Sequence, residues 1–367
     1  MASNSALFQP MKVGNAQLEH RVVLAPLTRF RSDANHVPTA LQEEYYAQRA
    51  TKGGLLISEA TFISPTAGAY PGAPGIYTEE QIVAWKRVTD AVHAKGGIIY
   101  VQLWHVGRAT SSVLLPNNAQ PVSASEVAIQ GPCLFTPGKD FEVPHALTVE
   151  EIAGITQDYA QAAKNAVAAG FDGVEIHGAN GYLLDQFTNT SSNKRTDQYG
   201  GSIENRTRFT LEVVKTISDA IGAERVGIRL SPWSEFQDMA DETPYDTWSH
   251  IVRELKAHHA NMAYLHMIEP RDDFSRKTEN DTVNTLDPFR ELWKDGVFMS
   301  AGGYTTKPEL ATEVADKTGN LIAIGRAFIA NPDIVYRLKN GVPLTRYNRD
   351  TFYTQGAVGY TDYPFAE

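Results

Sequence analysis

Eight short apolar runs recur along this chain, and they constrain its fold more than any other feature. Each is too short for a helix, and most are rich in β-branched residues: Val22–Ala25, Leu55–Ile57, Ile98–Val101, Gly173–Ile176, Val226–Leu230, Ala263–Met267, Val297–Met299 and Leu321–Ile324. Amphipathic helical stretches, such as Thr148–Ala169 and Tyr245–His259, separate most of them. Because parallel strands need crossover helices and a closed sheet has no edges, the pattern predicts an α/β fold, a (β/α)8 TIM barrel. A doubly wound open sheet is the alternative.

Two stretches interrupt this alternation. Phe8–His20 has the pattern of a short hairpin that turns at Gly14-Asn15, and we expect it to cap the bottom of the barrel. Residues 110–147, after the third run, are rich in Pro, Gly, Ser and Asn and show no helical period. Loops of this length are usually functional, so we expect an insertion that walls the mouth of the active site. Nothing resembles a linker, and residues 1–367 are predicted to form one domain.

Composition argues against nucleic-acid-binding, secreted and membrane-spanning proteins. The 367 residues include 33 basic and 43 acidic side chains, a formal charge of −10, which argues against a nucleic-acid partner because such proteins concentrate Lys and Arg. The N-terminus lacks the pattern of a secretory signal, and no apolar run is long enough to cross a bilayer. The single cysteine, Cys133, fits a reducing compartment. We therefore predict a cytoplasmic enzyme with no membrane partner, either a monomer or a homodimer.

Polar or glycine residues follow most of the runs, and barrel enzymes place their chemistry where strands end. After the fourth run come His177, Asn180 and Tyr182. If this segment enters a helical turn, His177 and Asn180 share a face and could both donate hydrogen bonds to one carbonyl oxygen, with Tyr182 delivering a proton. A structural histidine is the competing interpretation. A metal site of Glu175, His177 and His105 is a further alternative, but no zinc-type ligand spacing supports it.

The late strand ends indicate an anion site. Gly302-Gly303 and Gly325-Arg326 follow the seventh and eighth runs, where barrels commonly bind a phosphate against backbone N–H groups, and Arg326 adds a bidentate partner. Arg229, inside the fifth run, would be costly to bury unless an anion or another acceptor met it. A salt bridge to a neighbouring carboxylate is one interpretation. The negatively charged pyrimidine end of a reduced flavin is the other.

At these residues the chain resembles the Old Yellow Enzyme family of flavin-dependent ene-reductases. The matching motifs begin at Leu24-Ala-Pro-Leu-Thr-Arg29 and continue in one order to the C-terminal region, which makes the resemblance highly specific. The others are Ser58–Thr61, Gln102–Arg108, Gly170–Leu184, Tyr199–Arg206, Ile324–Ile329, Asp350–Tyr353 and Gly359–Pro364. The family binds flavin mononucleotide (FMN) in a barrel, in agreement with the strand count.

The resemblance implies a role for each candidate residue. Arg229 would face the pyrimidine end of the flavin, His177 and Asn180 would bind the substrate's carbonyl or nitro oxygen, and Tyr182 would protonate its α-carbon. Contacts to the isoalloxazine ring are implied for Pro26, Thr28, Ala60 and Gln102, and contacts to the phosphate for Gly302, Gly303, Gly325 and Arg326. Aromatic walls for the substrate are implied at Tyr70, Trp104, Phe274 and Tyr353, although core packing explains any one of them equally well.

The implied function is an NAD(P)H-dependent ene-reductase that reduces the C=C bond of α,β-unsaturated carbonyl or nitro compounds. FMN would be tightly bound, NADPH or NADH would be the reductant, and no metal is predicted. Two alternatives stay open, a flavin-dependent alkene isomerase and a non-catalytic flavin-binding barrel. The Tyr182 phenol argues against the isomerase, because a proton donor commits the reaction to the saturated product. The complete set of donors argues against a binding protein, which needs none of them.

Overall fold

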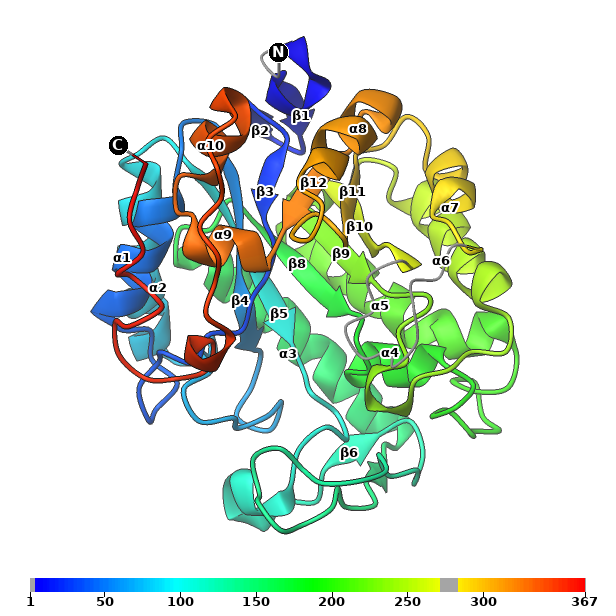
Figure 1. Cartoon of the computed structure of the whole chain (residues 1–367). Helices are drawn as coiled ribbons and strands as arrows, with labels where there is room; N and C mark the ends of the chain where they lie inside the picture. The colour runs from blue at the N-terminus through cyan, green and yellow to red at the C-terminus, as the bar shows by residue number, and fades with distance from the viewer. Residues whose placement is uncertain (1–3, 271–282, 367) are drawn as a thin grey trace.

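A closed barrel of eight parallel strands organises the computed structural model of this chain, which describes residues 4–270 and 283–366 (Figure 1). The strands are β3 (Val22–Leu24), β4 (Leu55–Phe62), β5 (Ile98–Trp104), β8 (Gly173–Gly178), β9 (Val226–Leu230), β10 (Tyr264–Ile268), β11 (Phe298–Ala301) and β12 (Leu321–Ile324). Each pairs with its neighbours in chain order, and β12 pairs with β3 to close the ring. All eight predicted runs form strands. The TIM-barrel prediction is confirmed, and the open sheet is wrong.

Helices surround the barrel and connect its strands (Figure 1). Their bounds are α1 (Ala40–Arg49), α2 (Glu79–His93), α3 (Val149–Ala168), α4 (Leu183–Thr188), α5 (Ile203–Ile221), α6 (Pro244–His258), α7 (Asp287–Leu292), α8 (Glu309–Thr318), α9 (Arg326–Ala330) and α10 (Ile334–Asn340). Capping boxes begin α2 and α3, where the hydroxyls of Thr78 and Thr148 accept hydrogen bonds from the backbone N–H three residues later. Over the two described ranges, no helix combines the length and apolarity needed to span a bilayer.

Strand side chains alternate between two apolar layers. Val23, Leu55 and Ile57 belong to a small cluster inside the barrel, whereas Leu24 and Leu56 pack outward in the large cluster shared with the helices. The predicted hairpin is present as β1 (Met11–Val13) and β2 (Ala16–Leu18), and its buried residues join the inner cluster. The hairpin therefore caps the amino-terminal end of the barrel, and the opposite end is left for the site.

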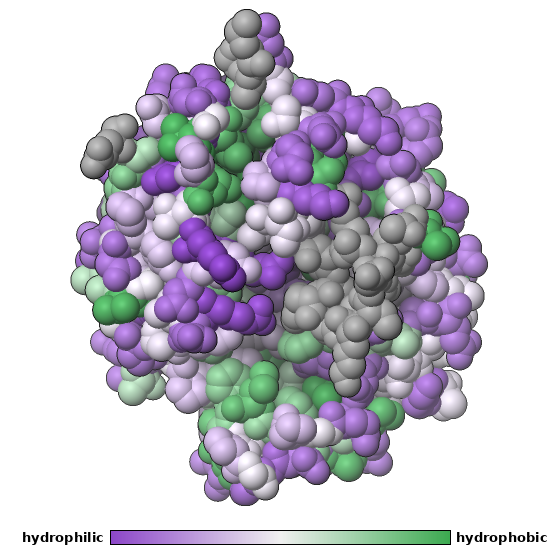
Figure 2. Space-filling view, in the orientation of Figure 1, coloured by the Kyte–Doolittle hydropathy of each residue, from purple (hydrophilic) through white to green (hydrophobic). Residues whose placement is uncertain are grey.

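The insertion after β5 projects away from the barrel (Figure 1). It contains a parallel pair of very short strands, β6 (Val122–Ser123) and β7 (His145–Ala146). Its exposed large apolar side chains are Val113, Leu134 and Val143, and Figure 2 shows apolar surface gathered at this edge of the molecule. Its Phe135 ring stacks on the ring of Tyr70 with centroids 4.0 Å apart. That the insertion walls the active site stays a prediction.

Candidate functional site

A cavity of about 300 Å³ opens at the carboxyl ends of the barrel strands. Each of the eight strands contributes to its lining, either through its last residues or through those that follow directly. The predicted residues that line it are Pro26, Thr28, Ala60, Gln102, Trp104, His177, Asn180, Tyr182, Arg229, Gly302, Gly303, Gly325, Arg326 and Tyr353. Residues scattered over more than three hundred positions of sequence thus meet in one space because a closed parallel barrel brings all its strand ends to one rim.

A bulge in β4 shapes one side of this cavity. The register between β4 and β5 shifts between Ile57 and Ala60, so that Ala60 comes to lie opposite Gln102. The bulged Glu59 is fully buried, and its carboxylate accepts hydrogen bonds from the backbone N–H groups of Arg29 and Phe30. Bulges are common beside active sites because they redirect side chains. Here the bulge brings Ala60 and Gln102 together on the cavity wall.

Hydrogen-bond donors and aromatic rings form a second wall. The Tyr182 ring lies edge-on to the rings of Trp104 and His177, with centroid distances of 4.9 and 5.0 Å. The expectation that His177 and Asn180 share a helical turn is wrong. His177 lies on β8, and Asn180 follows in a left-handed turn with φ +58°, before α4 begins. A strand end followed by this turn brings both side chains to the cavity without a helix.

The protonation of this wall follows from its burial. Burial, and then the positive charges of Arg229 and His266, hold the pKa of His177 well below its ordinary value. The imidazole is therefore neutral at pH 7. Burial likewise raises the pKa of Tyr182 above that of a free phenol, so this side chain keeps its proton. The wall consequently offers uncharged donors at neutral pH.

Glu175 connects the cavity residue Gln102 to His266. One oxygen of its carboxylate accepts a hydrogen bond from Gln102 Nε2 at 2.7 Å, and the other lies 2.8 Å from His266 Nδ1. All three side chains are buried. Because the amide nitrogen of Gln102 is used in this way, its oxygen is left as an acceptor on the cavity side. The described residues contain no cluster of three side chains that could bind a metal, and Glu175 is occupied by its two partners.

Arg229 also lines the cavity, and on β9 it lies between His177 of β8 and His266 of β10. Burial lowers the pKa of its guanidinium, and the negative charge of Glu175 partly offsets this. Both oxygens of Glu175 nevertheless bind other side chains, and the Arg229 Nε is buried without a hydrogen-bond partner. The structure therefore favours a ligand, rather than a salt bridge, as the partner that this guanidinium requires.

The last two strand ends form the other side of the cavity. Gly302 and Gly303 have φ values of +120° and +79°, a conformation that side-chain-bearing residues rarely adopt. Gly325 directly precedes α9, and the first residue of that helix is Arg326. Backbone N–H groups and a guanidinium are thus gathered where a phosphate is commonly bound in barrels.

These residues fit FMN. Arg229 Nε lies at this cavity, buried without a hydrogen-bond partner. Most buried polar atoms in proteins are paired, so a bound group is expected to satisfy it. The donor at Arg229 and the acceptor at Gln102 complement the C=O and N–H groups on the edge of a pyrimidine ring. Arg326 and the glycine backbone complement a phosphate.

The remaining aromatic predictions have different outcomes. Tyr353 lies at the rim and is 63% exposed. Tyr70 does not line the cavity; it is buried against Trp104, with ring centroids 5.4 Å apart, and its hydroxyl donates to the carbonyl of Ala109. Phe274 lies outside the described residues.

Sequence reasoning did not name several lining residues, including Thr305, Phe236, Arg349 and Phe352. The last two belong to a C-terminal segment that Arg31 holds in place by donating hydrogen bonds to its backbone carbonyls. The motif Asp350–Tyr353 was the available signal, because it marked this segment as part of the site.

A parallel barrel with this cavity at its carboxyl rim defines the class of the protein, a flavin-dependent oxidoreductase. The profile of the NADH:flavin oxidoreductase / NADH oxidase family matches residues 6–345. The chain belongs to this family, and the Old Yellow Enzyme family membership expected from the motifs is confirmed.

Individual relatives agree over nearly the full length. The chain is 48% identical to flavin oxidoreductase hxnT of Emericella nidulans, covering 98% of each chain. It is 50% identical to 12-oxophytodienoate reductase 1 of Oryza sativa, covering 98% of this chain and 93% of the relative. The solved structure of morphinone reductase superposes with a TM-score of 0.91 at 44% identity, covering 99% of this chain and 97% of the other.

Proposed function

We propose that this protein is an NAD(P)H-dependent FMN ene-reductase, in which the residues around the cavity reduce the activated C=C bond of α,β-unsaturated carbonyl or nitro compounds. One observation carries the proposal. His177, Asn180 and Tyr182 face the same cavity as Arg229 and the Gly325-Arg326 segment. Donors for a substrate oxygen, a proton source and a flavin-binding surface therefore lie within reach of one bound substrate.

The cofactor site divides between three sides of the cavity. Arg229 and the Gln102 amide oxygen would bind the pyrimidine edge, and Arg326 with the neighbouring glycine backbone would bind the phosphate. The isoalloxazine ring would lie against Pro26, Thr28 and Ala60. Held by these residues, FMN would supply hydride chemistry to the β-carbon of the alkene, with NADPH or NADH as the reductant.

His177 and Asn180 bind the carbonyl or nitro oxygen of the substrate. The neutral imidazole and the amide each donate one hydrogen bond, and both side chains are buried. These bonds strengthen as negative charge grows on the oxygen, so they withdraw electron density from the alkene and activate its β-carbon. This is the arrangement of an oxyanion hole applied to an extended conjugated system.

Tyr182 protonates the α-carbon. Its raised pKa keeps the phenol protonated at pH 7, and its ring is fixed between Trp104 and His177. A proton delivered here completes the saturation of the double bond, which favours reduction over isomerisation.

The test is an anaerobic titration of the purified, FMN-loaded protein. NADPH should bleach its yellow colour, and cyclohexenone should restore it while cyclohexanone accumulates in equal amount. An isomerised alkene formed while the protein stays bleached would favour the isomerase alternative, because hydride returned to the flavin leaves no net oxidation. A protein that stays bleached and converts no activated alkene, either to a saturated or to an isomerised product, would favour the non-catalytic flavin-binding barrel.

Both NADPH and NADH are proposed as reductants. The rates at which each bleaches the protein, measured under the same conditions, would establish the preference. A solved relative, morphinone reductase, is described in complex with tetrahydroNAD, which supports a nicotinamide binding in the same cavity.

We also propose a cytoplasmic location, since the one cysteine, Cys133, is buried and unpaired, as suits a reducing compartment. The proposed oligomeric state is a monomer or a homodimer, and light scattering would distinguish the two.

A further inference from the structure

The turn that carries Asn180 into the cavity has an unfavourable backbone conformation. Asn180 and Gly181 both have positive φ, +58° and +74°. A side chain at Gly181 would meet the carbonyl oxygen of Phe236 at 2.8 Å, so glycine is required there. A non-glycine residue such as Asn180 adopts this region only when its surroundings hold it there.

Four side chains hold this turn through its backbone. The N–H of Asn180 donates to Ser231 Oγ at 2.8 Å, and the N–H of Gly181 donates to Asp185 Oδ2 at 2.8 Å. The two carbonyls of the turn accept from Gln237 Nε2 at 3.0 Å and from Gln186 Nε2 at 2.8 Å. Every backbone donor and acceptor of these two residues is thus bound by a side chain rather than by a regular backbone ladder.

Asp185 is the centre of this arrangement. It is 1% exposed, and besides Gly181 it receives hydrogen bonds from the Asn189 amide and the Ser231 hydroxyl. Burial raises the pKa of Asp185 to about 7, and these hydrogen bonds oppose the rise. Its carboxyl therefore links β9, which ends just before Ser231, to the first turn of α4.

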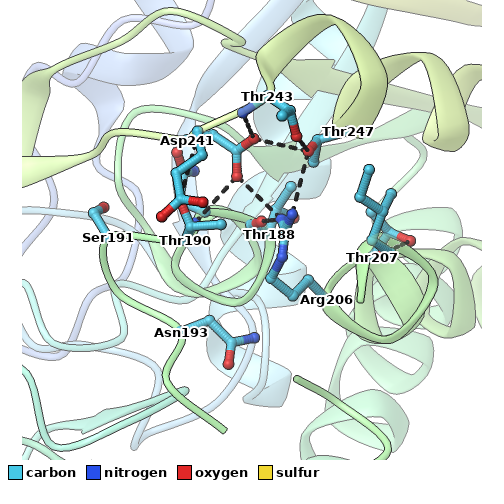
Figure 3. A network of polar contacts seen from close by, with 12 residues as sticks. Thr188, Thr190, Ser191, Asn193, Arg206, Thr207, Asp241, Thr243 and Thr247 are labelled. Carbon is cyan, nitrogen blue, oxygen red and sulfur yellow. Dashed lines mark hydrogen bonds and ion pairs between the residues drawn. The ribbon is translucent and has the colours of Figure 1, made fainter. Parts of the chain in front are cut away.

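The other end of α4 is anchored as well. Arg206 on α5 donates to the carbonyl of Thr188 and pairs with Asp241 at 3.0 Å, and Asp241 also accepts from the backbone of Thr190 (Figure 3). Both charged side chains are nearly fully buried. Because α4 is fixed at this end, the turn cannot release its conformation by a shift of the helix.

We propose that Ser231 and Asp185 are positioning residues, which hold the Asn180–Gly181 turn so that the Asn180 amide and the Tyr182 phenol face the substrate. They act through the backbone and do not line the cavity themselves. This inference rests on the proposed function, which assigns the substrate oxygen to Asn180.

Ser231→Ala tests it, with Ser192→Ala as the matched control. Ser192 is also fully buried and its hydroxyl also bonds near α4, to the carbonyl of Gln186, but its removal leaves every hydrogen bond of the turn in place. The probe is p-hydroxybenzaldehyde, titrated into FMN-loaded protein and followed by its charge-transfer band. Exchange of the amides of residues 180 and 181 with deuterium is measured in parallel.

Ser231→Ala should weaken phenol binding and speed amide exchange by about tenfold each, the loss expected for one buried hydrogen bond. Its FMN affinity should remain within about twofold of wild type, and Ser192→Ala should change neither readout. The isosteric Asp185→Asn places an N–H against another donor and should have the same effect as Ser231→Ala. It serves as the second variant if Ser231→Ala does not fold.

The inference would be overturned if both turn variants bound p-hydroxybenzaldehyde and exchanged the amides of residues 180 and 181 as the wild type does. It would also be overturned if Ser192→Ala changed both readouts as much as Ser231→Ala does. If the wild-type protein binds no phenol, the proposed function fails instead. The exchange of the two amides still reports on the turn in that case, so the two failures are distinguishable.

Discussion

Replacement of Tyr182 by phenylalanine isolates the proposed proton donor from the wall that carries it. The ring packs edge-on against Trp104 and His177 at 4.9 and 5.0 Å, and phenylalanine keeps these contacts. Only the hydroxyl is lost. Since burial raises the pKa of Tyr182, the wild-type phenol remains protonated across the neutral range.

General acid catalysis by a positioned side chain typically contributes about 10² to 10⁴ in rate. Water can partly replace the phenol here, because Tyr353 at the cavity rim is 63% exposed. We therefore expect the lower end, an oxidation of reduced protein by cyclohexenone that is about 10²-fold slower, equivalent to about 2.7 kcal/mol in activation free energy. Reduction by NADPH needs no proton from Tyr182 and should stay within about twofold of wild type.

Anaerobic stopped-flow measurement of the two half-reactions separates these effects. For the wild type, the rate of the alkene half-reaction should not fall between about pH 6 and 8, since the raised pKa of Tyr182 keeps its phenol protonated there. Equal slowing of both half-reactions by Tyr182→Phe, or slowing of neither, would refute the assignment of the phenol as proton donor.

Three further perturbations probe the same structure. His177→Ala combined with Asn180→Ala should reduce kcat/KM for cyclohexenone by about 10² or more, with FMN content as the control; retained activity would contradict their role. Arg229→Met should weaken FMN binding by about tenfold, measured by fluorescence titration, and make the reduction potential of the flavin more negative, measured by dye equilibration. Both effects are expected because the change removes the positive charge proposed to stabilise the reduced pyrimidine end. Asp241→Ala leaves Arg206 buried and unpaired, so the melting temperature should fall by about 4 to 6 °C, corresponding to about 3 to 5 kcal/mol. An unchanged melting temperature by calorimetry would show that the pair contributes nothing to stability.

The barrel could be predicted from sequence because its signal is local and repeated. Each run, for example Val226–Leu230, is short, apolar and flanked by helical stretches, and eight such units leave few topologies. The hairpin at Gly14-Asn15 is equally local. The residues directly after each strand could then be assigned to one rim, which is why most of the predicted lining residues meet in one cavity.

The parts that the sequence did not predict depend on contacts between distant segments. The left-handed turn at Asn180 is held by Ser231 and Asp185, and no pattern within residues 177–182 indicates those partners. Tyr70 lies behind Trp104 because Phe135 of the insertion stacks on it, a contact across more than sixty residues of sequence. Propensity and periodicity contain no information about such contacts.

A crystal structure of the FMN-loaded protein with p-hydroxybenzaldehyde tests the central claim most directly. The account predicts the phenol oxygen within hydrogen-bond distance of His177 and Asn180, above a flavin whose phosphate lies at Gly303, Gly325 and Arg326. A ligand bound outside this cavity, or a phosphate held elsewhere, would contradict it.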